Sequence, residues 1–537
     1  MALGVPSESP AIVVKEVDLT GGVPNVQSTT GAIAGKFRWG PAGVAKKIST
    51  ETELASTFGA PDDAHTVDFH SAAYFLKYSN ALQVIRAVDT SAFNAGSADS
   101  AGAADFIRNA DHRDGLTGLN TWAAKYPGTL GNSLKYVKIN STGWAGANAS
   151  HKAEFDAAPA VGEVHVLVLD EDGVITGTAN TVLERFPFLS TTSSAQNADG
   201  SSNFAPNVIN AQSSWLWYND AAFTDSTGSA SMAFGTDGSV VVADYQTAYN
   251  QIEDKDTIEV DFLIAAGMAN ATDQETLVDD LAVTAGTTRK DCVVVTSPSK
   301  ASVVNNADPV AASVTEADTF ARSSYVVVDN NHLKVYDKYN DKYIHIPAAS
   351  STAGIMAASD NDTAPWFSPA GARRGGYLGV TNLAYTPTKS QRDTLYKAAI
   401  NPIANLPGQG VLLFGDKTHL ARPSAFDRIN VRRLFLVLER AIALAARNTM
   451  FEFNDEFTRA EFVSIVEPFL REVKGRRGIT DFRVVCDETN NTGAVIDNNE
   501  FVANIFIKPA RSVNYITLNF VAVRTGVDFE EVAGLQV

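Results

Sequence analysis

The sequence predicts a multidomain protein of mixed α+β and α/β class. An α/β part with a β-rich insertion precedes a C-terminal domain in which two long helices pack on a mainly antiparallel sheet. The chain has 537 residues, 45% of them hydrophobic, which is enough for roughly two to four domains with buried cores. Residues 257–299 alternate between strand and helix patterns. Two long amphipathic helix patterns, followed by strands, fill the last third.

The N-terminal region begins with a strand pattern and continues with a helix that leads into a second strand. Residues 11–18 (AIVVKEVD) are predicted to form a strand, and a TGGVPN turn follows. Residues 66–79 show the spacing of one apolar helical face, and residues 81–88 form a strand. The small, polar stretch 91–104 predicts a loop and marks a boundary.

The middle of the chain is predicted to hold a hairpin, further strands and a parallel strand pair. Residues 161–177 give an apolar strand, a DEDG turn and a second strand. Residues 190–240 are rich in small and polar residues, with Trp215 and Trp217 alternating as on a strand. Two strands around one helix in residues 257–299 predict a parallel pair, which is a common packing unit of α/β proteins.

The last third is predicted to contain two long helices and then strands. In SAFDRINVRRLFLVLERAIALAARN the apolar residues follow the three-four spacing of a buried helical face. The second helix is predicted to begin at a capping box of Thr458 and Glu461, to kink at Pro468, and to stop at Gly475 and Gly478. The strands DFRVVCD, FVANIFIKP and NYITLNFVAVRT follow.

Charge is distributed unevenly along the chain, whose net charge is -18. Residues 371–537 hold 21 Lys and Arg against 18 Asp and Glu, whereas residues 1–370 hold 22 against 43. This balance argues against a general nucleic-acid binder, which presents a broad basic surface. A local basic cluster nevertheless lies where the second helix ends: Arg471, Lys474, Arg476 and Arg477. Favourable interaction with the helix C-terminus explains one or two of these four charges.

The sequence assigns no catalytic, cofactor-binding or metal-ligating residue. GVLLFGDKT at 410–418 resembles a phosphate-binding loop, but its spacing is one residue too long and its apolar residues indicate a buried strand. DEDG reads as a hairpin turn, and His65 and His70 are wrongly spaced for a metal. Cys292 and Cys486 stand beside valines and are expected to be buried. Neither a secretory signal nor a membrane-spanning run is expected.

Long segments over most of the chain resemble one known family. The C-terminal ones are YLGVTNLAYTPTKSQRDTLYKAAINPIANLPGQGVLLFGDKT, PSAFDRINVRRLFLVLERAI, FEFNDEFTRAEFVSIVEPFLREVKGRRGITDFRVVCDETNN and IKPARSVNYITLNFVAVRTGVDFEE. Earlier ones are YPGTLGNSLKYVKI, DEDGVITGTANTVLERF and YDKYNDKYIHIPAASSTAGIMAASDNDTAPWFSPAG. These segments are similar to the tail sheath protein of contractile-tailed phages. The resemblance is weakest at about 90–120 and 190–240, where larger members carry extra outer domains.

The resemblance implies a structural protein and not an enzyme. Family members stack as hexameric rings in a helical sleeve around a rigid tail tube, and a baseplate trigger shortens the sleeve to drive the tube through the host envelope. The implied partners are further copies of the chain, the tail tube protein, baseplate proteins and tail terminator or neck proteins. No cofactor, direct nucleic-acid contact or membrane insertion is implied. The implied location is the tail of the virion, after assembly in the host cytoplasm.

The resemblance also suggests how the chain is divided. The expected parts are an N-terminal arm at 1–25 packing with the C-terminal inner domain, an outer α/β domain at 26–90 and 250–365, a β-rich outer insertion at 91–249, a tube-facing inner domain at 366–524, and a C-terminal arm at 525–537. In the family, terminal arms add strands to a neighbour's sheet. The arm residues expected to do so are Ile12, Val13, Val14, Val17, Val527, Phe529 and Val532.

Alternatives stay open for the basic cluster and for the function. The cluster either holds the extended sheath by exposed charge pairs with the tube or an adjacent subunit, or it caps its helix and pairs with Glu467 or Glu472. A sheath of a bacterial contractile injection system or a tailocin is the close functional alternative. The remote one is an α/β hydrolase or nucleotide enzyme built around residues 258–297.

Overall fold

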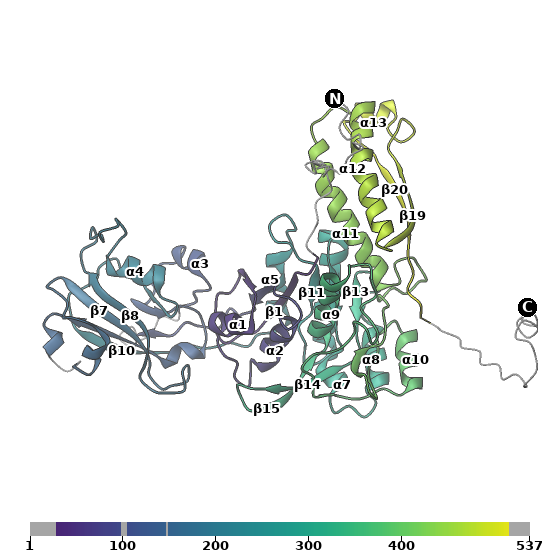
Figure 1. Cartoon of the computed structure of the whole chain (residues 1–537). Helices are drawn as coiled ribbons and strands as arrows, with labels where there is room; N and C mark the ends of the chain where they lie inside the picture. Colours follow the sequence, from purple (N-terminus) through teal and green to yellow (C-terminus); the bar gives the residue numbers. More distant parts are fainter. Residues whose placement is uncertain (1–27, 98–104, 146–148, 515–537) are drawn as a thin grey trace, which may run out of the picture.

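The computed structural model describes residues 28–97, 105–145 and 149–514. The molecule is elongated and has three parts (Figure 1). A β-rich lobe lies at one end, and an α/β body lies in the middle. A tower of two long helices and two strands rises from the body.

The body is built on a six-stranded sheet with the strand order β13-β12-β11-β1-β3-β2. Five strands run parallel, and β2 is antiparallel at one edge. Four of the six are buried along their whole length, as expected for parallel strands that helices cover on both faces. The strands are β1 (Gly31–Gly35), β2 (Ala45–Ile48), β3 (Leu82–Arg86), β11 (Phe262–Ile264), β12 (Val293–Thr296) and β13 (Val326–Val328).

Helices cover both faces of this sheet. One face packs against α5 (Val242–Tyr249), α6 (Ala271–Val283) and α8 (Pro309–Ala317). The other face packs against α1 (Glu51–Phe58), α2 (Thr66–Phe75) and α9 (Ala349–Asp362). The predicted helix and strand after residue 66 are confirmed as α2 and β3. The predicted parallel pair is confirmed as β11 and β12, which α6 connects.

The lobe contains a seven-stranded sheet with the order β8-β7-β6-β10-β4-β5-β9, and all of its strand pairs are antiparallel. Its own hydrophobic cluster includes Trp122, Val166 and Leu216. The strands are β4 (Gly96–Ser97), β5 (Trp122–Ala124), β6 (Leu134–Asn140), β7 (Glu163–Asp170), β8 (Thr181–Ser190), β9 (Leu216–Tyr218) and β10 (Gly228–Ala233). Two helices accompany them, α3 (Ala110–Asp114) and α4 (Ala205–Gln212).

The hairpin predicted over residues 161–177 is wrong in its second strand. β7 ends at Asp170, and β8 begins only at Thr181. The Asp170 carboxylate accepts backbone N–H groups from Gly173 at 3.1 Å and from Thr176 at 2.7 Å. This side chain therefore holds a wider turn and keeps the residues directly after DEDG out of the sheet.

Two small sheets and several short helices complete the body. One sheet pairs β15 (Lys342–Pro347), β14 (His332–Asp337) and β16 (Asn382–Leu383), and the other pairs β17 (Ile403–Leu406) with β18 (Gly410–Leu413). The helices are α7 (Lys300–Val303) and α10 (Lys389–Lys397), and α6 continues as a π-helical segment, Thr284–Arg289. Short 3-10 turns lie in the lobe at Thr129–Ser133, Gly143–Ala145 and Ala149–Glu154, in the body at Asn250–Ile252, and in the tower at Arg447–Thr449.

The tower consists of α11 (Ile429–Ala446), α12 (Glu456–Gly475), α13 (Gly493–Asp497) and the antiparallel pair β19 (Ile479–Val485) and β20 (Asn504–Pro509). α11 joins two cores, because Leu436 packs in the body and Leu438 packs against α12. Trp366 belongs to the tower core, whereas Leu383 and Leu413 belong to the body. Of the predicted strand NYITLNFVAVRT, the described residues include the first, Asn514; the rest of the strand lies outside them.

The predicted start of the second long helix is wrong by three residues, because the N-cap is Asp455 and not Thr458. α12 begins at Glu456, and Asp455 is its N-cap, with its carboxylate accepting the Thr458 N–H at 2.8 Å. Thr458 lies inside the helix and is buried, so it does not form the predicted capping box. The helix continues through Pro468 and ends at Gly475.

Candidate functional site

The basic cluster occupies the last turn of α12 and the residues that end it. Arg476 is the C-cap, and Arg477 then adopts the left-handed conformation with φ 67°. The Gly478 N–H donates to the Val473 carbonyl at 2.9 Å, which closes a Schellman-type helix end. A Cβ at residue 478 would lie 2.7 Å from Val473 Cγ1, so close packing requires this glycine.

Three members of the cluster have partners within the chain. All of these side chains are at least one-third exposed, so each pair is expected to contribute only about 0 to 1 kcal/mol. Their exposure also leaves them accessible to a second molecule. The pairs are Arg471 with Glu467 (2.7 Å), Arg476 with Glu472 (3.5 Å) and Lys474 with Asp481 (3.1 Å).

Arg477 differs from the other three. Within the described part of the chain, its side chain takes part in no ion pair or hydrogen bond. A positive φ costs a residue with a Cβ roughly 1 to 2 kcal/mol, whereas glycine adopts it freely. Arg477 thus occupies a helix-ending position that glycine would adopt without this cost.

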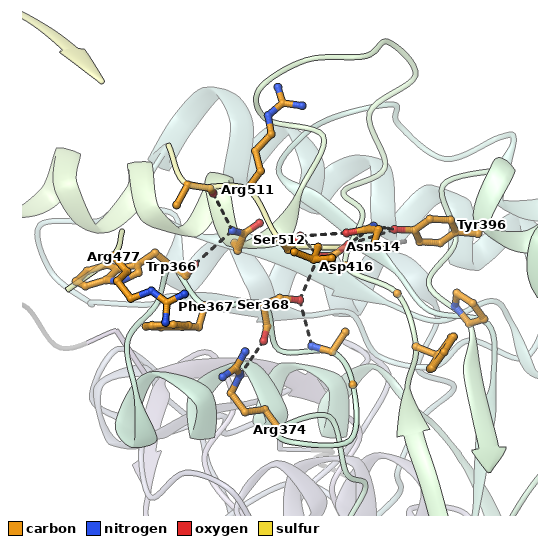
Figure 2. A pocket seen from close by; sticks show the side chains of 18 of the residues that line it. Trp366, Phe367, Ser368, Arg374, Tyr396, Asp416, Arg477, Arg511, Ser512 and Asn514 are labelled. Atoms are coloured by element: carbon orange, nitrogen blue, oxygen red, sulfur yellow. Dashed lines mark hydrogen bonds between the residues drawn. The ribbon is translucent and has the colours of Figure 1, made fainter. Parts of the chain in front are cut away.

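Arg477 borders a cavity of about 930 Å³ at the base of the tower, called here the tower-base cavity. The end of α12 and the start of β19 form one wall, and α10 and the segment after β18 form the opposite wall. Figure 2 shows Arg477 beside Trp366 and Phe367 on one side, with Tyr396 and Asn514 on the other. The cavity thus lies where the chain leaves the tower toward its C-terminus.

The lining of this cavity includes four aromatic and six basic side chains. Trp366, Phe367, Tyr396 and Phe414 supply aromatic surface. Asp416 is buried and accepts hydrogen bonds from several lining side chains, including Ser512 at 2.7 Å. It also pairs with Arg428 at 3.0 Å. The cationic lining residues are Arg374, Lys389, Arg392, Lys474, Arg477 and Arg511, against the carboxylates Asp393 and Asp416.

The root of the tower is fixed to the body by buried arginines of α11, which the sequence reasoning missed. Arg433 pairs with Asp360, and both side chains are almost fully buried. Arg440 lies 2.6 Å from Asp261 in a second, largely buried pair. Burial raises the pKa of Asp261 to about 6 although Arg440 opposes the shift, and burial also raises the pKa of Asp360. The only sequence signal was a pair of arginines within an otherwise apolar helix face.

The same buried pairs hold the chain where it enters the body. The Ser28 hydroxyl donates to Asp360 at 2.7 Å, and the Thr30 N–H donates to Asp261 at 2.9 Å. The expected arm residues Ile12, Val13, Val14, Val17, Val527, Phe529 and Val532 lie outside the described residues. Residues 28–30, which begin the described part of the chain, are therefore bonded to the body.

The phosphate-loop look-alike and the two cysteines lie in strands, in buried positions or in internal hydrogen bonds. The phosphate-loop look-alike is strand β18, and the Lys417 ammonium that follows it donates to the Tyr396 carbonyl at 2.7 Å. Cys292 and Cys486 are buried, and burial raises the pKa of both thiols. The described residues contain no group of His, Cys, Asp and Glu arranged to hold a metal. Within the same ranges, none of the helices has the length and apolar character needed to cross a membrane.

Two family models match the chain. Residues 238–419 match the phage tail sheath protein central domain, and residues 421–522 match the phage tail sheath C-terminal domain. The change from one model to the other falls shortly before α11, where the tower begins.

Full-length relatives and a solved structure agree with these matches. The chain is 32% identical to the tail sheath protein of Enterobacteria phage T4, covering 98% of this chain and 99% of the relative. It is 30% identical to the tail sheath protein of Vibrio phage KVP40, with the same two coverages. The fold matches the anti-feeding prophage helical sheath in its contracted state with a TM-score of 0.54 at 13% identity, covering 96% of this chain and 99% of that one. The chain therefore belongs to the family of phage tail sheath proteins.

Proposed function

We propose that the chain polymerises as stacked hexameric rings around a tail tube, and that shortening of this sleeve drives the tube through the host envelope. The observation that carries the proposal is the nearly full-length similarity to two phage tail sheath proteins. The fold shared with a helical sheath in its contracted state supports both the helical assembly and the contraction. In this proposal the protein has no catalytic role, and the work comes from contacts between subunits.

The proposed partners follow from the same comparison. They are other copies of the chain, the tail tube protein, baseplate proteins and tail terminator or neck proteins, in the tail of the virion after assembly in the host cytoplasm. No cofactor, direct contact with nucleic acid or membrane insertion belongs to the proposal. The net charge of -18 supports the exclusion of nucleic acid, because like charges repel.

The basic cluster is the proposed contact with the tube or an adjacent subunit. Arg471, Lys474 and Arg476 form exposed pairs, which can exchange partners without unfolding the helix that carries them. Each such pair is weak, at about 0 to 1 kcal/mol, but the contact repeats at every subunit. A lattice that must hold and then release requires many contacts of this kind.

Terminal arms are the proposed permanent links between subunits. Residues 11–18 and 526–533 have strand patterns, and strands added to a neighbour's sheet survive a rigid-body rotation because main-chain hydrogen bonds hold them. Deletion of residues 525–537 is expected to abolish polymerisation and to leave the thermal unfolding of the subunit unchanged. Sleeves formed by the truncated chain would exclude this role for the C-terminal arm.

The proposed function is tested by electron microscopy of the purified full chain over a range of concentrations, with and without tail tubes. Rings or sleeves are expected. A single particle of about one chain, 57.2 kDa, at every concentration and with tubes present would contradict the proposal.

A sheath of a contractile injection system is a second candidate. The observation that favours it is the fold shared with the anti-feeding prophage sheath. Capsid and terminase genes beside the gene for this chain would identify a phage, and their absence would identify an injection system or tailocin.

A further inference from the structure

The loop between α11 and α12, together with the first turn of α12, carries a cluster of exposed apolar side chains, called here the aromatic tip. Its members Met450, Phe451, Phe453 and Phe457 are 59%, 100%, 84% and 76% exposed. Glu452, Asp455 and Glu456 lie among them, so the tip is acidic as well as aromatic. Isolated exposed apolar residues are common, but three exposed phenylalanines within seven residues are typical of a surface that another molecule covers.

The backbone of the aromatic tip is anchored to the rest of the tower. The Asn454 side-chain amide donates to the Glu500 carbonyl at 2.7 Å, and Arg459 donates to the Asn454 side-chain oxygen at 2.9 Å. Asp455 caps α12 directly beside them. One residue of the loop thus points inward as an anchor while its neighbours are exposed. A preformed surface loses little conformational entropy when it binds.

The tower-base cavity has the complementary chemistry. Its walls include Trp366, Phe367 and Phe414, the last of which is 48% exposed. Lys389, Arg477 and Arg511 take part in no ion pair within the described ranges. Aromatic walls suit phenylalanine rings, and unpaired cations suit the carboxylates that lie among those rings.

We propose that the aromatic tip of one copy docks in the tower-base cavity of a second copy. The tip lies at the start of α12 and the cavity lies at its end, so the length of this 20-residue helix, about 30 Å, separates them. A tip therefore cannot reach the cavity of its own chain. Two different patches at opposite ends of one helix form a heterologous contact, which generates rings or open helices. The inference deepens the proposed function, on which it rests, by naming a contact that repeats from subunit to subunit.

Cross-linking of full-length chains tests the contact. One chain carries Phe453→Cys, and another carries Phe414→Cys at the cavity. A short bismaleimide is expected to link the mixed chains into dimers. A chain with Phe234→Cys is the matched control, because Phe234 is an exposed phenylalanine (67%) of the β-rich lobe, and it should not link to Phe414→Cys. Equal linkage of the control would overturn the proposal.

Charge reversal sharpens the test. Arg477→Glu with Arg511→Glu on the Phe414→Cys chain is expected to lower the dimer yield about tenfold. Adding Glu452→Lys and Glu456→Lys to the Phe453→Cys chain should restore it. A yield that does not respond to either change would contradict the docking. Because all four charged side chains are exposed, the subunit should stay folded, with only a small loss of stability, about 0.3 to 1 kcal/mol, from Glu456→Lys in the first turn of α12.

Two outcomes separate this proposal from the proposed function. Sleeves in the microscope without any tip-to-cavity linkage would overturn the docking and leave the sheath function standing. Linkage of Phe414→Cys to Phe529→Cys in place of Phe453→Cys would assign the cavity to the C-terminal segment and would also overturn the docking. Linkage to the tip in sleeves supports both proposals.

Discussion

The two long helices of the tower use their arginines in opposite ways. Arg433 and Arg440 of α11 reach into the body and pair with buried aspartates. Arg471 and Arg476 of α12 pair with glutamates one turn away on the same helix, at the surface. Breaking one side of a buried pair leaves a charge without solvent, whereas breaking an exposed pair exchanges a partner for water. The difference separates ion pairs whose loss should destabilise the subunit from ion pairs that can exchange partners at little cost.

The largest effect is expected from breaking a buried pair. Arg433→Ala leaves Asp360 buried beside no cation, and about 3 to 5 kcal/mol of stability should be lost. The measurement is denaturant unfolding of the unassembled chain. Arg471→Ala is the matched control and should change stability by about 0 to 1 kcal/mol. Equal losses of stability in the two variants would contradict the difference between the buried and the exposed ion pairs.

The pH dependence of a buried carboxylate gives the next largest effect. Asp329 is fully buried, and burial raises its pKa to about 7. A raised pKa means that the folded state binds this proton more tightly, so the contribution to stability falls as the pH rises from about 4 to 7. The free energy of unfolding of the wild-type chain should fall by about 2 to 3 kcal/mol between pH 5 and pH 8 relative to that of Asp329→Asn, as measured by denaturant unfolding at each pH. If the wild-type chain and Asp329→Asn differ by the same unfolding free energy at every pH in this range, the raised pKa of Asp329 is contradicted.

An exposed carboxylate should respond with the opposite sign. The hydrogen bond from Lys474 lowers the pKa of Asp481, so its contribution to stability is present above the unfolded-state pKa and disappears as the solution becomes more acidic. Asp481→Asn should therefore lower the stability slightly above pH 5 and flatten the acid side of the stability profile.

The cap of α12 should have an intermediate effect. Asp455→Ala removes the acceptor of the Thr458 N–H and should lower stability by about 0.5 to 2 kcal/mol. Because Asp455 lies beside the aromatic tip, the same variant should also weaken polymerisation. Glu461→Ala is the control, since Glu461 is exposed and has no capping role in the structure. A larger loss with Glu461→Ala would favour the capping box predicted from the sequence.

The smallest effect is a gain. Arg477 has φ 67°, so Arg477→Gly should raise the stability of the subunit by about 0.5 to 1 kcal/mol. The same substitution should weaken assembly because the side chain at the cavity is lost. A variant that is both more stable and equally able to assemble would leave Arg477 without a functional role.

Elements with a strong local pattern were predictable, whereas long-range pairings were not. The strand, helix and strand around α6 follow from hydrophobic spacing that lies within one stretch of chain. The partners of Arg433 and Arg440 lie 73 and 179 residues away, so no local pattern identifies them. The cap at Asp455 was missed because Asp and Thr are both good N-caps, and the loop before the helix decides between them. The cluster at 471–477 was found from charge alone, but its division into paired residues and a strained Arg477 required the structure.

The separation of folding contacts from assembly contacts is tested most directly by a chain carrying Arg471→Glu and Lys474→Glu. Both side chains are exposed, so we expect a melting temperature within about 2 °C of the wild type and a nearly complete loss of extended sleeves on tail tubes, both measured on the same preparation. Sleeves of normal length, or loss of sleeves only because the subunit unfolds, would contradict this account.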